Sequence, residues 1–141
     1  MLALVVLAVA LGHGAVEVGT REATPPRLVV AGAPTAWAID HRAVLYVVRL
    51  RNAGTRDVIV LGVGRNRVPG LVLVDARLGG HAVDRFRLAR HAQAELRLRY
   101  AVHDCAHAPV DRLPVEVRAR IEQARIHVVM LHLIARRAGV C

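Results

Sequence analysis

One stretch of the chain decides the fold: Ala94-Glu95-Leu96-Arg97-Leu98-Arg99-Tyr100-Ala101-Val102-His103-Asp104. Successive side chains of an extended strand point to opposite faces, which separates this stretch into an apolar side and a charged side. The apolar side holds Ala94, Leu96, Leu98, Tyr100 and Val102, and the polar side holds Glu95, Arg97, Arg99 and His103. A strand with one dry and one solvated face is typical of an antiparallel sheet.

The same period of two recurs elsewhere in the chain. Val115, Val117, Ala119 and Ile121 alternate with charged residues, and Val44–Arg51 shows a looser version of the pattern. We therefore predict an all-β domain over residues 28–141, an antiparallel sandwich or barrel of about seven or eight strands. The expected strands are Leu28–Ala31, Ala43–Arg51, Asp57–Val63, Leu71–Arg77, Val83–Leu88, Ala94–His103, Pro114–Glu122 and Arg125–Ile134.

The last fifth of the chain also fits a helix by composition, because Glu116–Arg137 is rich in Ala, Arg, Glu and Leu. A helix would scatter the alternating apolar residues of its first half around the surface, whereas a strand gathers them on one face. Ile126–Ile134 is almost continuously apolar, so its period does not decide between strand and helix. Its Val and Ile content favours a strand.

All twenty basic residues are arginine, and the chain contains neither lysine nor serine. The formal net charge is +9. Without serine there is no Ser-His-Asp nucleophile, and without lysine there is no Schiff base or P-loop lysine. No cofactor motif occurs, so the sequence predicts a non-enzymatic domain.

Residues 1–18 are apolar apart from His13 and Glu17. A helix over this segment would be about 27 Å long, close to the thickness of a hydrocarbon core. The segment is typical of a signal peptide or membrane anchor, followed by a linker over residues 19–27. A buried first strand or helix is the alternative. The export interpretation places the domain outside the cytoplasm, either membrane-anchored or secreted.

Cys105 and Cys141 are the two cysteines. An even number in an exported chain indicates a disulfide that ties the end of the Ala94 strand to the C-terminus. The alternative is a metal-binding or metal-delivery domain that uses His103, Cys105, His107 and Cys141. Asp104 with His103 or His107 offers an acid–base pair, but the sequence supplies no nucleophile for it.

Eight arginines occupy solvated positions of the expected strands, which predicts an arginine stripe on one sheet able to attract anionic lipid or cell-wall polymer. The alternative is an ordinary solvated face. Specific nucleic-acid binding is not expected, because stacking aromatics and a groove-reading helix are not evident. The eight are Arg49, Arg51, Arg85, Arg87, Arg97, Arg99, Arg118 and Arg120, of which all but Arg85 and Arg87 are the candidate contacts.

Two sets of residues resemble known domains. Tyr46–Thr55 followed by Val58–Val60 resembles the strand-turn-strand core of immunoglobulin-like or fibronectin-type-III-like bacterial domains. Ala94–Tyr100, Asp104-Cys105, Pro114-Val115 and Cys141 are similar to a group of small exported actinobacterial proteins of unknown function. The resemblance implies an immunoglobulin-like antiparallel β-sandwich and a disulfide, and it supplies no catalytic residue. Together these observations predict an exported accessory or interaction module with a protein partner in the cell envelope.

The disulfide and metal hypotheses predict different intact masses. A bond between Cys105 and Cys141 removes two hydrogens, so we expect the native chain to be about 2 Da lighter than the reduced chain. Mass spectrometry before and after reduction measures the difference. Two titratable thiols with co-purifying zinc would instead support the metal hypothesis.

Overall fold

The computed structural model describes residues 24–135 as nine β-strands joined by turns and loops. In chain order they are β1 (Leu28–Asp40), β2 (Ala43–Asn52), β3 (Val58–Val63), β4 (Leu71–Leu78), β5 (His81–Ala82), β6 (Phe86–Leu88), β7 (Gln93–Val102), β8 (Arg112–Ile121) and β9 (His127–Ile134). Within this range there is no helix, and hence none long and apolar enough to span a membrane. The expected anchor over residues 1–18 and its apolar helix lie outside the described residues.

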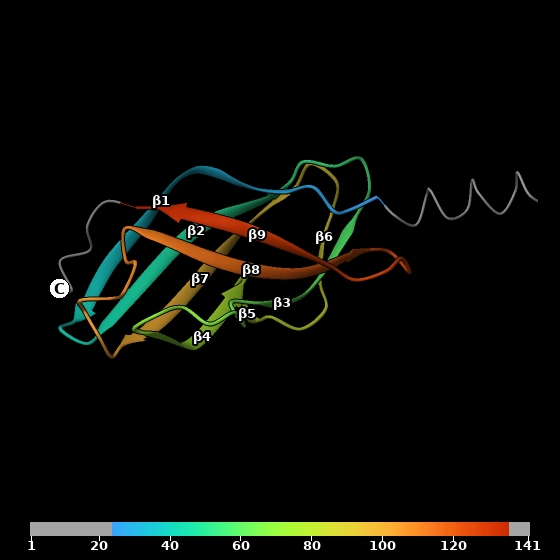
Figure 1. The fold of residues 1–141 in the computed structure, drawn as a ribbon. Coiled ribbons are helices and arrows are strands. Elements are labelled where there is room, and N and C mark those ends of the chain that lie inside the picture. Colours follow the sequence, from blue (N-terminus) through green and yellow to red (C-terminus); the bar gives the residue numbers. More distant parts are fainter. Residues whose placement is uncertain (1–23, 136–141) are drawn as a thin grey trace, which may run out of the picture.

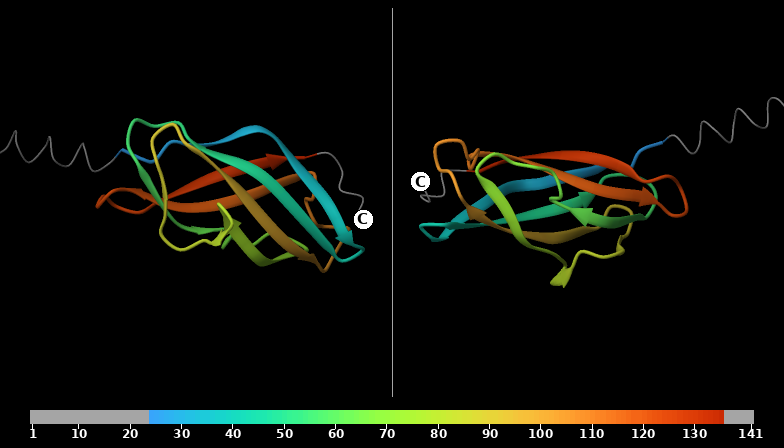
Figure 2. Two further views of the ribbon diagram at one scale, coloured as in Figure 1. Left: turned by 180° about the vertical axis from the view of Figure 1, so that it is seen from behind. Right: turned by 60° about the horizontal axis from the view of Figure 1, so that its bottom comes forward.

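The strands form two antiparallel sheets that pack face to face as a β-sandwich (Figure 1). One sheet has five strands in the order β1-β2-β7-β4-β5, and the other has four in the order β6-β3-β8-β9. Seen from behind, β1, β2 and β7 lie in front of β8 and β9 (Figure 2, left). The all-β prediction is confirmed for the described part of the chain.

Strand β7 lies at the centre of the five-stranded sheet, between β2 and β4. Its apolar residues Leu96, Leu98 and Tyr100 are at most 1% exposed, while Glu95, Arg97 and Arg99 are exposed. In the other sheet, β8 buries Val115, Val117 and Ala119 against the same core. The alternation seen in the sequence therefore identifies the two central strands and the faces that they bury.

Two strand predictions need correction. Strand β1 continues to Asp40 instead of ending at Ala31, because the chain passes an irregularity between Ala31 and Thr35 and then resumes pairing with β2. Gly32, at φ +76°, supplies the left-handed conformation within that irregularity. The expected strand over Val83–Leu88 is regular only over Phe86–Leu88, and the two-residue strand β5 precedes it.

Two buried tyrosines meet edge to face in the core, with ring centroids 5.9 Å apart and an interplanar angle of 90°. The Tyr46 hydroxyl donates a hydrogen bond of 2.8 Å to the Val110 carbonyl, which fixes the β7–β8 loop to β2. The Tyr100 hydroxyl is buried and has no hydrogen-bond partner among residues 24–135. Burial raises the pKa of Tyr100 to about 12 and also raises the pKa of Tyr46. Both tyrosines are therefore neutral structural groups at physiological pH.

The two hydroxyls predict opposite responses to removal. Tyr46→Phe leaves the Val110 carbonyl without its donor, so we expect the free energy of unfolding to fall by about 1–2 kcal/mol. Tyr100→Phe removes an unpaired buried hydroxyl, so we expect no loss and a gain of up to about 1 kcal/mol. Urea denaturation of the two variants measures the difference. Equal losses in both variants would contradict this assignment of the two hydroxyls.

Candidate functional site

The outer face of the five-stranded sheet holds a cluster of exposed arginines, which we term the arginine face. Arg49 and Arg51 lie on β2, and Arg97 and Arg99 lie on β7 beside them. Arg77 of β4 lies directly opposite Arg97 in the ladder. Because neighbouring strands are about 4.8 Å apart, these five side chains share one continuous surface.

The arginine face is only partly neutralised. Arg97 pairs with Glu95 at 2.6 Å, and Arg77 pairs with Asp75 at 3.1 Å. Both pairs join side chains that are about half exposed, so solvent screens them and each contributes little to stability. Within residues 24–135 no ion pair involves Arg49, Arg51 or Arg99. These three guanidinium groups are available to an anion.

Strand β1 adds an apolar border to the arginine face. Its Trp37 lies opposite Leu45 of β2, and Leu45 lies opposite Arg99 of β7. The Trp37 side chain is 51% exposed although it belongs to the type of residue that proteins usually bury. A surface of this composition offers guanidinium groups beside an exposed indole ring.

The structure divides the predicted arginine stripe between the two sheets. Arg118 and Arg120 lie on β8, in the four-stranded sheet, and Arg87 lies on β6 of that sheet. Arg85 lies in the bend before β6 with a positive φ of 50°. The expectation of a single stripe is therefore wrong, because strict alternation identifies an outward position but does not say which sheet a strand joins.

The β7–β8 loop contains four of the residues that the sequence singled out, and two of them form a pair. His107 Nδ1 lies 2.7 Å from Asp104 Oδ2, and the backbone N–H of Ala106 donates to Asp104 Oδ1. The pair lowers the pKa of Asp104, chiefly through the hydrogen bond from His107. His103 and Cys105 are exposed in the same loop. The Asp104–His107 pair is thus formed, and it organises an exposed loop.

Gly70 holds this loop against the sheet. Its carbonyl accepts the N–H groups of His103 and Asp104, and its own φ is +72°. A Cβ atom at Gly70 would come within 2.4 Å of the Asp104 carbonyl oxygen. The approach of the two backbones therefore requires glycine at this position.

The predicted disulfide and metal site both include Cys141, which lies outside the described residues. In the described part, no group of three or more His, Cys, Asp or Glu side chains is arranged to hold a metal ion. The last described residue, Ala135, donates its N–H to Asp111 in the β7–β8 loop.

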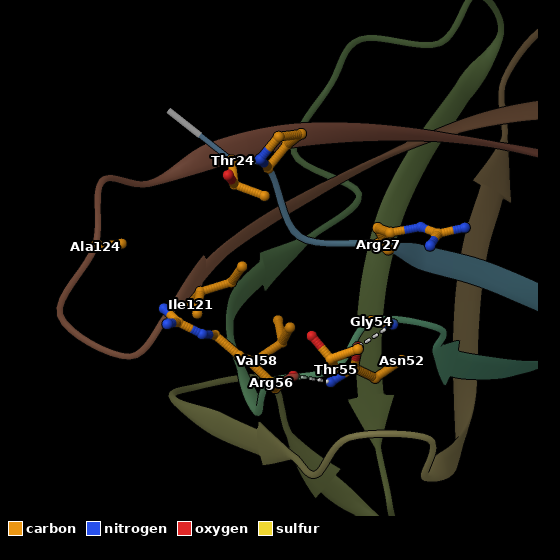
Figure 3. Close-up of a pocket in the computed structure, with 10 residues that line it drawn as sticks. Thr24, Arg27, Asn52, Gly54, Thr55, Arg56, Val58, Ile121 and Ala124 are labelled. Atoms are coloured by element: carbon orange, nitrogen blue, oxygen red, sulfur yellow. Dashed lines mark hydrogen bonds between the residues drawn. The ribbon is translucent and has the colours of Figure 1, made fainter. Parts of the chain in front are cut away.

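A cleft of about 200 Å³ opens at the end of the sandwich where residues 24–27 enter it (Figure 3). Val58 and Ile121 give it an apolar floor, and Thr55 contributes a hydroxyl to its rim. The Arg27 and Arg56 side chains point away from each other (Figure 3). The polar groups of the cleft do not converge, whereas a specific small-molecule site requires polar groups that converge on the ligand.

Asn52, which lines this cleft, is a structural residue that sequence reasoning missed. It is fully buried, and its Nδ2 donates to the carbonyls of Arg56 and Leu88. Its Oδ1 accepts the N–H of Gly54. The asparagine therefore closes the β2–β3 turn and holds the end of β6 near it. The Asn-Ala-Gly sequence signals a turn, but not this burial.

Asp57 joins the start of β3 to β6 at the same end of the molecule. Its Oδ2 accepts two hydrogen bonds from Arg87, at 2.9 and 2.6 Å, and its Oδ1 accepts the Arg90 N–H. These hydrogen bonds, led by those from Arg87, lower the pKa of Asp57. Asp57 is an ionised structural group at neutral pH.

No family model and no curated protein matches this chain.

The lowered pKa of Asp57 predicts an acid-dependent loss of stability. The folded pKa lies below the unfolded value of about 3.9, so the carboxylate stabilises the fold above that pH, and its contribution is lost as the pH falls through the folded pKa. We expect Asp57→Asn to lower the melting temperature near pH 7 and to differ less from wild type near pH 2. Thermal melts across this range test it, with Asp84→Asn as the control in a nearby loop. A difference that does not change with pH would contradict the role of Asp57.

Proposed function

We propose that the domain is an immunoglobulin-like β-sandwich. The strand order supports this, because β1-β2-β7-β4 corresponds to strands A-B-E-D of a constant-type domain. The order β3-β8-β9 corresponds to strands C-F-G, and the chain visits all seven in alphabetical sequence. The short strands β5 and β6 are then an insertion between D and E, in which β6 pairs beside strand C.

The proposed function is that of a non-enzymatic interaction module outside the cytoplasm, tethered to the membrane or secreted, which contacts anionic surfaces through its arginine face. The observation that carries this proposal is a group of exposed arginines that form no ion pair within residues 24–135, namely Arg49, Arg51 and Arg99, bordered by the exposed indole of Trp37. Arginine fits phosphate oxygens bidentately, and tryptophan prefers the boundary between water and hydrocarbon.

Two anionic surfaces of the cell envelope fit this chemistry, namely phospholipid headgroups and phosphate-bearing cell-wall polymers. Both attract a positively charged protein surface over about one Debye length. Neither attraction requires the protein to have a pocket for a single small molecule. Strand β2 holds Arg49 and Arg51 in a rigid row, so their charge is presented without ordering a loop. Contact of this kind orients the domain on the envelope and leaves its other faces open to a protein partner.

The proposal predicts salt-sensitive retention on anionic membranes. We expect the full-length chain to bind phosphatidylglycerol vesicles more strongly than phosphatidylcholine vesicles, and the excess to shrink as salt rises from about 50 to 200 mM. Because an arginine near an anionic surface contributes about 1 kcal/mol, the double variant Arg49→Gln, Arg51→Gln is expected to lose about tenfold or more of the excess. Vesicle co-sedimentation measures the retained fraction. Comparing anionic with neutral vesicles removes any contribution of residues 1–18 that is common to both.

The matched control is the double variant Arg112→Gln, Arg118→Gln, which removes the same charge from the four-stranded sheet. We expect it to retain most of the excess binding. Equal losses in the two double variants would show that net charge, rather than the arginine face, determines retention. Excess binding to an isolated cell-wall fraction but not to vesicles would identify the polymer as the anionic surface.

A further inference from the structure

Four strands form the edges of the two sheets, and three of them are protected against pairing with another chain. Strands β5 and β6 are two and three residues long. Strand β1 is long, but it contains Gly32 and Pro34 and shows two register shifts against β2. Short length, proline and irregular register are the devices by which natural sheets keep their edges unpaired.

Strand β9 has none of these devices. Its eight residues, His127 to Ile134, include no Arg, Asp, Glu, Pro or Gly. It pairs with β8 over eight consecutive residues without a register shift, and on its other side no strand of the described part of the chain pairs with it. Strand β1, which lies near it, belongs to the other sheet and forms no ladder with it (Figure 1).

All four outward side chains of β9 are exposed, and three of them are apolar, the fourth being His132. Val128 is 57% exposed, Met130 is 44% exposed and Ile134 is 62% exposed, and Ile126 extends this row into the preceding turn. Alternate backbone N–H and C=O groups of an edge strand point away from its partner and are free to bond to another strand. An edge strand that is regularly paired, has no formal charge and has exposed apolar side chains favours the addition of another strand.

We infer that β9 pairs antiparallel with β9 of a second copy, so that the four-stranded sheets of the two copies join into one continuous sheet. The strand is suited to this because its branched aliphatic residues are placed symmetrically about Leu131, although Met130 falls opposite His132. A two-fold axis at Leu131 sets Val128 opposite Ile134 on the outer face and Val129 opposite Leu133 on the inner face. Such a closed interface uses the same residues from both copies.

Charge also favours a second copy bound through this strand rather than through any other face. Each chain has a net charge of +9, so two copies repel through most of their surfaces, and β9 contains no formally charged residue. The repulsion between copies is screened by salt. Added salt should therefore strengthen the dimer, whereas it weakens binding of the arginine face to anions. The dimer does not depend on the arginine face, which lies on the other sheet.

Two substitutions, at positions that are almost equally exposed, test the inference. Val128→Arg places a charge on the β9 edge, and Val74→Arg places the same charge on β4, where Val74 is 58% exposed. We expect sedimentation equilibrium of the full-length chain in mild detergent to give twice the chain mass for wild type and Val74→Arg. The Val128→Arg variant is expected to sediment at the mass of a single chain. Circular dichroism verifies that each variant is folded, and Met130→Arg repeats the test if Val128→Arg fails to fold.

Several outcomes would overturn the inference. If the wild-type chain stays monomeric at high protein concentration and high salt, the β9 dimer does not form. A dimer that survives both Val128→Arg and Met130→Arg must form elsewhere, for example through residues 1–18. Dissociation of Val74→Arg to the same extent as Val128→Arg would show that added charge alone separates the copies. Loss of the dimer in Val128→Arg, with retention on anionic vesicles unchanged, would support the β9 dimer independently of the arginine face.

Discussion

The register of β7 is the constraint on which the rest of the structure depends. Strand β7 pairs with β2 over nine residues on one side and with β4 on the other. A slip of one residue would turn Leu96 and Leu98 to solvent and Arg97 and Arg99 into the core. Burying two arginines without partners costs far more than any single contact in this domain supplies. The alternating charges thus fix the register as firmly as the apolar residues do.

Buried polar groups outside the strand ladders then set the two ends of the sandwich. At one end, Asn52 satisfies carbonyls of the β2–β3 turn and of β6. At the other end, the Tyr46 hydroxyl bonds to Val110 in the β7–β8 loop. Each bond joins segments that the ladders leave unconnected. The core and the loops are therefore specified by different kinds of residue, apolar in the sheets and neutral polar at the ends.

The sequence predicted the strands well, because alternation is a local signal. The expected boundaries of β2, β3 and β7 lie within one residue of those observed, and β9 is a strand as its Val and Ile content suggested. Sheet membership is not local, so the pattern could not show that Arg118 and Arg49 belong to different sheets. It also could not show that β9 is an edge. In an almost continuous apolar sequence, both faces look buried, and only the packing of the two sheets reveals that Val128 and Met130 lie on the outer, exposed face.

The distribution of charge over the strands is the reverse of what protection against aggregation alone would produce. Central strands have two partners and need no protection, yet β7 and β8 have charged residues at most of their outward positions. The edge strand β9 has one open side and no formal charge. Solubility requires charge somewhere on a surface, but it does not require that an edge be free of it. Strand β9 has no formal charge in a chain with twenty arginines, and a covering strand best explains this absence. Pairing with that strand satisfies the open backbone groups of β9, so no charge is needed to keep other chains from pairing with them.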